Sequence, residues 1–583
     1  MSRDARLILA DSTALGHARL AITDPTEAGT QPFHDREHGI HAVIAGEFYA
    51  YEEDRALLQR EYAFVSHCDS EIVVPLYRKY GLGFLSRLRG EFAICLWDSS
   101  AQRLIVTRDR YGIKPLFWTK VNDRLLVASE MKAFLALGWQ PEWDVQSLRS
   151  EAWLYGNRTI FRGVNNVEPG YYVIFEHDHV QKGQYWEMDF PDKRKPETRS
   201  EDAMISGLFH RLDDATTRRI PSNFLPGVYL SGGLDSSVVA GIANRVARRR
   251  GERLTCLTIA FAEDSGVDES GIARRTAEWL GADLETVNVW EQDFADHFEK
   301  ATYHAEHLNP DLDYVGRYVL AERAHQMGLR TVLTGDGSDE HLGGYPCFLP
   351  DYVREPDLAW PSKSLNCEER QREVHLLEQK PMGYVGLEAR DHPIQQSIIS
   401  GRQHQSPNHT SISKLLWSHI GIPFAAWTSL YGKIDISRRR AEVADGRMKD
   451  LMDSKWHPLH TAQYIWTKSM LPSTELAGLG ERQDMAHSIE GRLPFLDHEL
   501  TVYINGLPPS MKIKWDGTSQ AYLEKYILRQ VAKKNSLVTH EVLDRQKQVS
   551  PAIRADADSR ETDILSSPTQ HRISSANAVL FIS

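Results

Sequence analysis

Cysteine is scarce in this sequence. Its 583 residues include five cysteines, an odd number, and no two of them form a Cys-x-x-Cys pair. A disulfide framework would need an even set, and a structural zinc site would need closely spaced pairs, so the sequence indicates neither. The opening residues 1–6 also lack the apolar stretch of a secretory signal. We therefore expect a cytoplasmic protein in a reducing environment.

A surplus of basic charge and long apolar runs are missing as well. The 68 Lys and Arg against 80 Asp and Glu give a net charge of −12, which does not favour binding to a nucleic-acid backbone. No apolar run approaches the roughly 20 residues that cross a bilayer. With 41% hydrophobic and 25% charged residues, the composition is that of a globular protein. We expect several domains, at roughly 150 residues each, and neither nucleic acid nor membrane as a partner.

Short β-type runs dominate the first 190 residues. Examples are His41–Ala45, Phe92–Trp97 and Tyr171–Phe175, separated by turn residues, and they predict packed β-sheets. A polar, proline-bearing stretch follows, which is typical of a linker. We therefore divide the chain into a domain at 1–190, a linker at 191–205, a second domain at 206–550 and a tail at 551–583. The tail is rich in Ser, Asp and Thr and is expected to be disordered.

Strand-type and helix-type segments alternate after the linker, which predicts a mostly parallel, doubly wound sheet. From about 350 to 460 the sequence is polar and irregular, and it fits either a substrate-facing insertion or a mobile loop. The fold class we expect is α/β with α+β. The segments are strands at 227–230, 254–261, 284–289 and 331–333, and helices at 237–249, 270–280 and 315–327.

A glycine- and serine-rich turn, loop 231–237, joins the first of these strands to its helix. Such a turn directs backbone N–H groups and a helix N-terminus at one spot, which favours an anion such as a polyphosphate. The alternative is an ordinary strand-to-helix turn in which a serine caps the helix. In the functional interpretation, Gly232 and Gly233 let the backbone approach the ligand closely. The hydroxyls of Ser231, Ser236 and Ser237 donate hydrogen bonds, and the carboxylate of Asp235 binds magnesium.

A second strand end carries the acidic turn 334–340, with sequence Thr-Gly-Asp-Gly-Ser-Asp-Glu. It places Asp336, Asp339 and Glu340 at the carboxyl end of a parallel strand, which is where open α/β sheets bind ligands. A solvated acidic turn without function is the alternative, but it leaves the neighbouring glycines unexplained. We therefore expect this turn to contribute to a ligand-binding site.

Five motifs in order make the sequence similar to the glutamine-dependent asparagine synthetases. They are SGGLDSS at 231–237, the run at 258–270, TGDGSDEHLGGY at 334–345, the run at 480–497 and DRQKQ at 544–548. Loop 231–237 resembles the pyrophosphate loop of ATP pyrophosphatases. Segments at 15–20, 46–49, 90–93 and 108–117 resemble a class II glutamine amidotransferase domain. The resemblance covers roughly residues 10 to 550 and implies an Ntn-type, β-layered amino-terminal domain.

The resemblance also implies ATP and Mg²⁺ as cofactors and assigns roles in the carboxyl-terminal domain. Asp235 and Asp339 would bind the metal, and Lys547 would contact phosphate during adenylation. Asp336 or Glu490 would be the base that takes a proton from the amine, with the alternative that Glu490 only pairs with Arg492. The remaining ATP contacts would come from Leu230, Ile259, Thr334 and Gly335 together with loop 231–237.

The amidotransferase-like domain departs from the family pattern. The family's mature chain begins with a catalytic cysteine, whereas this sequence begins Met-Ser-Arg-Asp, and the first hairpin of the family is expected to be absent. The family's oxyanion asparagine is replaced by Ala45, and losing one such donor costs about 100- to 1000-fold in rate. Arg19 and Asp69 remain where the family holds glutamine, which indicates a vestigial pocket. We therefore do not expect glutamine hydrolysis.

These observations predict an ATP-dependent, AMP-forming ligase that activates a carboxylate as an acyl-adenylate and joins it to an amine or ammonia. Small-molecule acids and amines are the expected partners. β-Lactam and carbapenam synthetases and lasso-peptide cyclases share this plan without the cysteine. The alternatives are a genuine asparagine synthetase and a catalytically inactive, nucleotide-binding homologue. The sequence leaves open the substrates, intra- or intermolecular amide formation, and the oligomeric state, a homodimer included.

Overall fold

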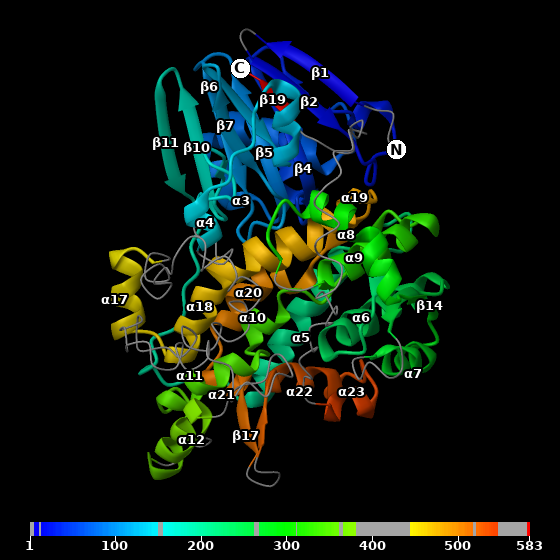
Figure 1. The fold of residues 1–583 in the computed structure, drawn as a ribbon, viewed down its shortest axis with the longest axis vertical. Coiled ribbons are helices and arrows are strands. Elements are labelled where there is room, and N and C mark those ends of the chain that lie inside the picture. The colour runs from blue at the N-terminus through cyan, green and yellow to red at the C-terminus, as the bar shows by residue number, and fades with distance from the viewer. Residues whose placement is uncertain are drawn as a thin grey trace.

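A computed structural model describes most of the chain. The described residues are 5–10, 13–149, 156–261, 268–309, 312–360, 365, 367–379, 444–516, 521–545 and 580–582. Two folded halves are stacked along the long axis of the molecule (Figure 1). Lys547 and residues 1–4 lie outside the described residues. Within the described part, no helix is both long enough and apolar enough to span a membrane.

The amino-terminal half contains two six-stranded sheets, in the orders β1-β2-β19-β8-β7-β9 and β11-β10-β6-β5-β4-β3. Residues from both sheets, such as Leu15 and Val127 from one and Val43 and Cys95 from the other, share one apolar core. The expected strand-rich organisation is therefore confirmed. The elements are β1 (Ala5–Ala10), β2 (Thr13–Ala18), β3 (Phe33–Asp35), β4 (Ile40–Phe48), α1 (Glu52–Leu58), α2 (Val73–Tyr80), α3 (Phe84–Arg87), β5 (Gly90–Asp98), β6 (Arg103–Arg108), β7 (Phe117–Val121), β8 (Arg124–Ala128), α4 (Val145–Arg149), β9 (Asn165–Asn166), β10 (Tyr171–Glu176) and β11 (His179–Gln184).

The far carboxyl end of the chain joins the first of these sheets. Strand β19 (Leu580–Ile582) lies between β2 and β8 and is antiparallel to both. These three residues therefore form a strand where the sequence predicts disorder. Local composition cannot predict this pairing, because the partner strands lie more than 400 residues earlier in the chain. The rest of the expected tail lies outside the described residues.

The carboxyl-terminal half is built on a parallel sheet of order β14-β13-β12-β15-β16. Alternate residues of its central strands face opposite sides, as the period of two requires. Val228, Cys256 and Leu333 pack with the core of α5, α6 and α7, whereas Tyr229 and Leu257 pack with that of α9. The doubly wound arrangement is confirmed. Its elements are α5 (Glu201–Arg218), β12 (Gly227–Tyr229), α6 (Leu234–Arg250), β13 (Thr255–Ala260), α7 (Ser270–Leu280), β14 (Asp283–Asn288), α8 (Glu291–Ala305), α9 (Asp313–Gln326), β15 (Thr331–Leu333), α10 (Ser338–Leu342) and β16 (Glu490–Arg492).

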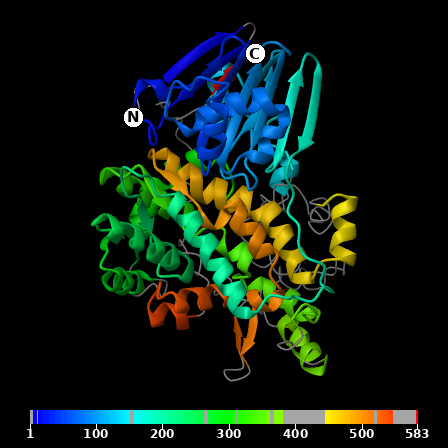
Figure 2. The ribbon, with the colours of Figure 1, turned by 180° about the vertical axis from the view of Figure 1, so that it is seen from behind.

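The carboxyl-terminal half has further helices at its border with the amino-terminal half and at its opposite end (Figure 2). Several of them fall in the region that the sequence predicts as irregular, so that prediction is wrong there. Helix α18 begins at the end of this region and is buried at almost every position. The remaining elements are α11 (Leu349–Arg354), α12 (Cys367–Gln379), α17 (Gly446–Ser454), α18 (Pro458–Met470), the π-helix η10 (Leu471–Glu481), α19 (Arg482–Ala486), α20 (His498–Asn505), α21 (Pro509–Lys512), β17 (Lys514–Asp516), β18 (Ala521–Leu523), α22 (Tyr526–Lys534) and α23 (His540–Asp544).

Candidate functional site

Loop 231–237 leads from β12 into α6 and has the turn geometry that the sequence predicts. Gly232 adopts a φ of +80°, and a Cβ there would lie 3.1 Å from the carbonyl oxygen of Glu269. Gly233 is the N-cap of α6, and no side chain caps the helix. The serine-cap alternative is therefore wrong, and first-turn N–H groups of α6 are left for another acceptor.

The serine hydroxyls of this loop have two different environments. The Ser231 N–H donates to Ser236 Oγ at 3.2 Å, and Ser236 Oγ donates to the carbonyl of Gly233 at 3.3 Å. These bonds hold the turn closed on itself. Ser237 is fully buried, and its hydroxyl has no hydrogen-bond partner in the described part of the chain.

The acidic turn 334–340 packs directly against loop 231–237. A Cβ on Gly335 would lie 2.9 Å from Asp235 Cβ and from the Ser236 nitrogen, so only glycine permits this approach. The Ser338 hydroxyl donates to Asp235 Oδ1 at 2.7 Å. The two motifs are therefore in contact, at the carboxyl ends of the neighbouring strands β12 and β15.

A lysine that the sequence analysis missed lies between the two expected metal-binding acids. Lys525 Nζ contacts Asp339 Oδ1 at 2.6 Å and also contacts Asp235 Oδ2. Its side chain is only 4% exposed. Although burial works against the charged form, the carboxylates of Asp235 and Asp339 raise the pKa of Lys525, which stays an ammonium. No local pattern marks this residue, because its partners lie far back in the sequence.

The acids around Lys525 fit magnesium that arrives with a polyphosphate. Within the described ranges, no group of three or more His, Cys, Asp or Glu could hold a metal alone. Mg²⁺ is usually bound through one or two carboxylates together with substrate phosphates, and Asp235 and Asp339 supply such a pair. Glu340, the third acid of the turn, is buried and accepts a hydrogen bond from the Tyr345 hydroxyl at 2.9 Å.

Asp336 lies at the more open side of the acidic turn, with its side chain 35% exposed. Arg317 Nη2 approaches Asp336 Oδ2 at 3.7 Å and contacts Asp484 Oδ2 at 2.7 Å. Arg317 Nε donates to the other Asp484 oxygen at 2.9 Å. This arginine, from α9, is a second charged residue of the site that sequence reasoning missed.

Glu490 faces a different space from loop 231–237. Its Oε1 contacts Arg492 Nε at 2.9 Å, so the ion pair considered from the sequence is present. Arg492 Nη2 also contacts Glu47 Oε1 of the amino-terminal half at 3.2 Å. Glu490 lines a cavity of about 80 Å³ between the halves, together with Ala45, Arg19 and other residues.

The residues expected around the nucleotide base and ribose are placed as follows. Leu230 is buried, and its N–H donates to the carbonyl of Leu257 at 2.8 Å. Ile259 packs in the cluster between β13, α8 and α9. Thr334 is buried, and its hydroxyl has no hydrogen-bond partner in the part of the chain that the structure describes. Lys547, expected at the phosphates, cannot be placed, because it lies outside the described residues.

The amidotransferase-like cavity keeps the two residues named for glutamine. Asp69 Oδ2 accepts a hydrogen bond from the Phe48 N–H at 2.7 Å, and burial raises the pKa of Asp69 to about 6. Arg19 donates to the Thr26 carbonyl at 2.6 Å and also to the carbonyl of Asp24. Both therefore line the cavity while being bound to the backbone.

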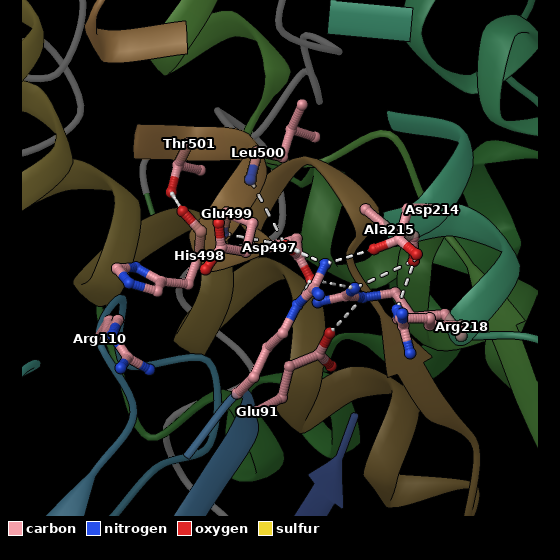
Figure 3. A network of polar contacts seen from close by, with 12 residues as sticks. Glu91, Arg110, Asp214, Ala215, Arg218, Asp497, His498, Glu499, Leu500 and Thr501 are labelled. Carbon is pink, nitrogen blue, oxygen red and sulfur yellow. Dashed lines mark hydrogen bonds and ion pairs between the residues drawn. The ribbon is translucent and has the colours of Figure 1, made fainter. Parts of the chain in front are cut away.

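An ion network joins the two halves (Figure 3). Arg219 Nε contacts Glu91 Oε1 at 2.9 Å and Arg219 Nη1 contacts Asp497 Oδ2 at 3.0 Å, with all three side chains nearly inaccessible. Arg89 of the amino-terminal half contacts Asp497 Oδ1 and Asp214 Oδ2, both at 2.8 Å. The contacts of Arg219 with Glu91 and Asp497 are therefore shielded from water.

Two family models match this chain. One is described as asparagine synthase and covers residues 207–578, and one is described as a glutamine amidotransferase domain and covers residues 3–186. Amidase chyE of Penicillium rubens is 42% identical over 545 residues, and amidase chry2 of Gibberella zeae is 43% identical over 546. Each alignment covers 91% of this chain and 80% of the relative. Asparagine synthetase (glutamine-hydrolyzing) 1 of Bacillus subtilis is 27% identical, over 92% of this chain and 79% of that protein.

Proposed function

The chain belongs to the asparagine synthase family, and from that premise we propose that it is an ATP-dependent ligase that activates a carboxylate as an acyl-adenylate and joins it to an amine. One observation carries this proposal. Asp235 and Asp339 converge on the Lys525 ammonium beside the uncapped start of α6. Positive charge, unpaired N–H groups and metal-binding carboxylates in one place suit a polyphosphate.

The first step in this proposal is attack of a substrate carboxylate oxygen on the α-phosphorus of ATP. The bond between the α-phosphorus and the bridging oxygen breaks, and pyrophosphate leaves with that electron pair. Negative charge grows on the leaving group, so N–H groups at the start of α6 and the Lys525 ammonium stabilise it. When bound, Mg²⁺ would be held by Asp235 and Asp339 and would supply charge neutralisation at the phosphates.

The second step is attack of a neutral amine on the acyl carbon, with AMP as the leaving group. Asp336 lies on the acidic turn that contacts loop 231–237, its side chain is 35% exposed, and it would accept the amine proton. Arg317 Nη2 lies 3.7 Å from its Oδ2. Glu490, the other candidate base, would accept the proton from the side of the cavity, where its carboxylate contacts Arg492.

We propose that glutamine does not supply the nitrogen. Ala45 has no side-chain donor for an oxyanion, and its position on β4 is part of the cavity wall. Cys68 also lines this cavity, but burial and the neighbouring Asp69 charge raise the pKa of its thiol well above the usual value. A thiol held neutral is a poor nucleophile. The amine would therefore be free ammonia or an amino group of a substrate.

Release of pyrophosphate tests this function. The purified chain is incubated with MgATP and a panel of amino acids and other carboxylates, with ammonium or a primary amine added. We expect release that depends on one acid, and formation of AMP in equal amount. Asp235→Asn should abolish it. Aspartate as the productive acid would identify an asparagine synthetase, and no release with any acid would favour an inactive nucleotide-binding homologue.

Amide hydrolysis is a second candidate, because two relatives above 40% identity are named amidases. Hydrolysis would need water instead of an amine, and it would need no ATP. The amides that correspond to the acids and amines of the panel are therefore offered with and without MgATP. Cleavage that is independent of ATP would favour the amidase, whereas synthesis that requires ATP would favour the ligase. Glutamate is measured alongside with glutamine as the only nitrogen source, and rapid production would contradict the loss of glutaminase activity.

A further inference from the structure

A second and larger cavity, of about 240 Å³, has walls from both halves and no part in the proposed reaction. The amino-terminal half lines it with residues of β7, β10 and the segment 156–169, and the carboxyl-terminal half with residues of α17, α18, η10 and α19. It shares no lining residue with loop 231–237, with the acidic turn or with the cavity of about 80 Å³. Pockets for drug-sized ligands begin at roughly 300 Å³, so this cavity suits a somewhat smaller organic molecule.

The acidic and basic side chains of this lining are equal in number, and each is already held by another group of the chain. Glu187 contacts Lys468 at 3.1 Å, and Asp445 accepts a hydrogen bond from a backbone N–H of α17 at 2.8 Å. The Arg108 guanidinium donates to three backbone carbonyls. A charged ligand would therefore be buried without a counter-ion, which favours an uncharged ligand. The remaining pairs are Glu168 with Lys182, Glu306 with Lys132, Arg158 with Asp144 and Arg482 with Glu306.

Two buried nitrogen atoms of the same lining lack a hydrogen-bond partner in the described part of the chain. They are His307 Nε2 and Arg482 Nε. The His307 side chain belongs to a residue that is 7% exposed, and Arg482 is 3% exposed. A buried polar atom left unpaired is costly, so a ligand that forms hydrogen bonds with both nitrogens would remove this cost.

The two nitrogens have opposite hydrogen-bonding roles. Arg482 Nε carries a proton and can only donate. His307 Nδ1 lies 2.8 Å from the Leu308 carbonyl oxygen, which can only accept, so the ring proton is on Nδ1 and Nε2 is an acceptor. Burial and the Arg482 charge lower the pKa of His307 to about 4, so the ring is neutral at neutral pH. The group that fits must therefore offer both an acceptor and a donor.

We propose that this larger cavity binds a small, uncharged primary carboxamide with an apolar body. The amide oxygen accepts a hydrogen bond from Arg482 Nε, and one amide N–H donates to His307 Nε2. Buried apolar and aromatic side chains of the lining, Phe117, Met131 and Tyr464, cover the body. The inference goes beyond the proposed ligase function and does not depend on it, because no residue of the proposed nucleotide site lines this cavity.

Thermal unfolding of the full chain, with a series of ligands that share one ring, tests this site. Benzamide is titrated without ATP, and benzoate, benzylamine and N,N-dimethylbenzamide are titrated at the same ionic strength. We expect benzamide to raise Tm by about 2 °C near saturation. Benzoate and benzylamine bring a charge, and dimethylbenzamide has no N–H, so none of the three should raise Tm. No rise with benzamide, or an equal rise with any of the three, would overturn the proposal.

Two variants with different physics locate the effect. His307→Phe removes the acceptor and keeps a ring, and Ser473→Phe fills space from η10 without changing either nitrogen. Both should abolish the benzamide-specific rise in Tm. His304→Phe is the matched control, because His304 lies three residues earlier and does not line the cavity, so it should keep the rise. A rise that persists in either cavity variant contradicts the inference, and the ligand series decides it without any variant if a substitution unfolds the chain.

Asp235→Asn separates this inference from the ligase function. The variant should keep the benzamide-specific rise in Tm, because Asp235 does not line the larger cavity. Loss of the rise would place benzamide at the proposed nucleotide site and overturn the inference. A benzamide-specific rise in the original chain without pyrophosphate release would support the cavity while the ligase function fails. Pyrophosphate release without any benzamide-specific rise would leave the ligase function standing and refute the cavity.

Discussion

Glu47 and Glu91 are direct partners across the ladder of β4 and β5, and each carboxylate contacts a different arginine of the carboxyl-terminal half. Glu47 Oε1 lies 3.2 Å from Arg492 Nη2, and Glu91 Oε1 lies 2.9 Å from Arg219 Nε. Like charges directly opposite on a sheet repel each other unless cations intervene. The end of this ladder therefore couples the folding of one half to the presence of the other.

Glu91→Gln should weaken this coupling. Arg219 and Glu91 are each only 1% exposed, and removing one partner of a buried pair costs about 3–5 kcal/mol. Because Arg219 keeps its contact with Asp497, we expect a loss of about 3 kcal/mol in the free energy of unfolding. Urea unfolding measures it. Asp283→Asn breaks the exposed pair with Arg253 and is the control, with an expected change within about 0.5 kcal/mol. Equal effects of the two substitutions would contradict the coupling.

Lys525→Met should make the chain respond to magnesium. Without the ammonium, Asp235 and Asp339 face each other uncompensated, and we expect a loss of about 3 kcal/mol in the absence of divalent cations. Mg²⁺ would replace the missing charge, so it should raise the Tm of the variant more than that of the original chain. Lys534→Met, which breaks an exposed pair with Asp202, is the control. A variant with no greater response to Mg²⁺ would show that the acids do not form a metal site.

Local patterning predicted four of the five strands of the parallel sheet and missed β16. Helix α7 and strand β15 match their expected bounds residue for residue, because apolar periodicity and the glycine after α7 mark them without help from distant segments. The acidic turn was also expected at the carboxyl end of a parallel strand, and it lies there, next to loop 231–237 because β15 pairs with β12. Lys525 and Arg317 could not be found this way, since each meets its acidic partners only through the folded sheet. Helix α17, which buries Met448 and Met452, falls in the region that the sequence predicts as irregular and was missed.

Gly335→Ala should separate nucleotide binding from folding. The added Cβ would lie 2.9 Å from Asp235 Cβ and from the Ser236 nitrogen, so it would push the acidic turn away from loop 231–237. We expect MgATP affinity to fall at least tenfold, measured by calorimetry, with circular dichroism unchanged. Gly446→Ala is the matched control, since a Cβ there meets nothing within 4 Å. Unchanged affinity in Gly335→Ala would show that the contact between the two loops does not serve the nucleotide.

Buried histidines should make the chain unstable in acid. Burial lowers the pKa of His17, His307 and His341 to about 4, so all three are neutral in the folded chain at neutral pH. In the unfolded chain they gain protons near pH 6.5, so unfolding takes up protons and the free energy of unfolding falls as the pH drops from about 6.5 to 4. Each contributes up to about 3 kcal/mol to this loss.

His341→Gln tests this acid limb at one position. His341 is 1% exposed and its Nδ1 lies 2.9 Å from Asn505 Oδ1, a contact that a glutamine amide can retain. The variant should lose stability less steeply between pH 6.5 and 4.5, by up to about 1.4 kcal/mol per pH unit, in urea titrations at a series of pH values. The exposed His210→Gln is the control and should leave the slope unchanged. If His341→Gln keeps the original slope, the histidine is not buried as a neutral group, and acid instability must come from other side chains.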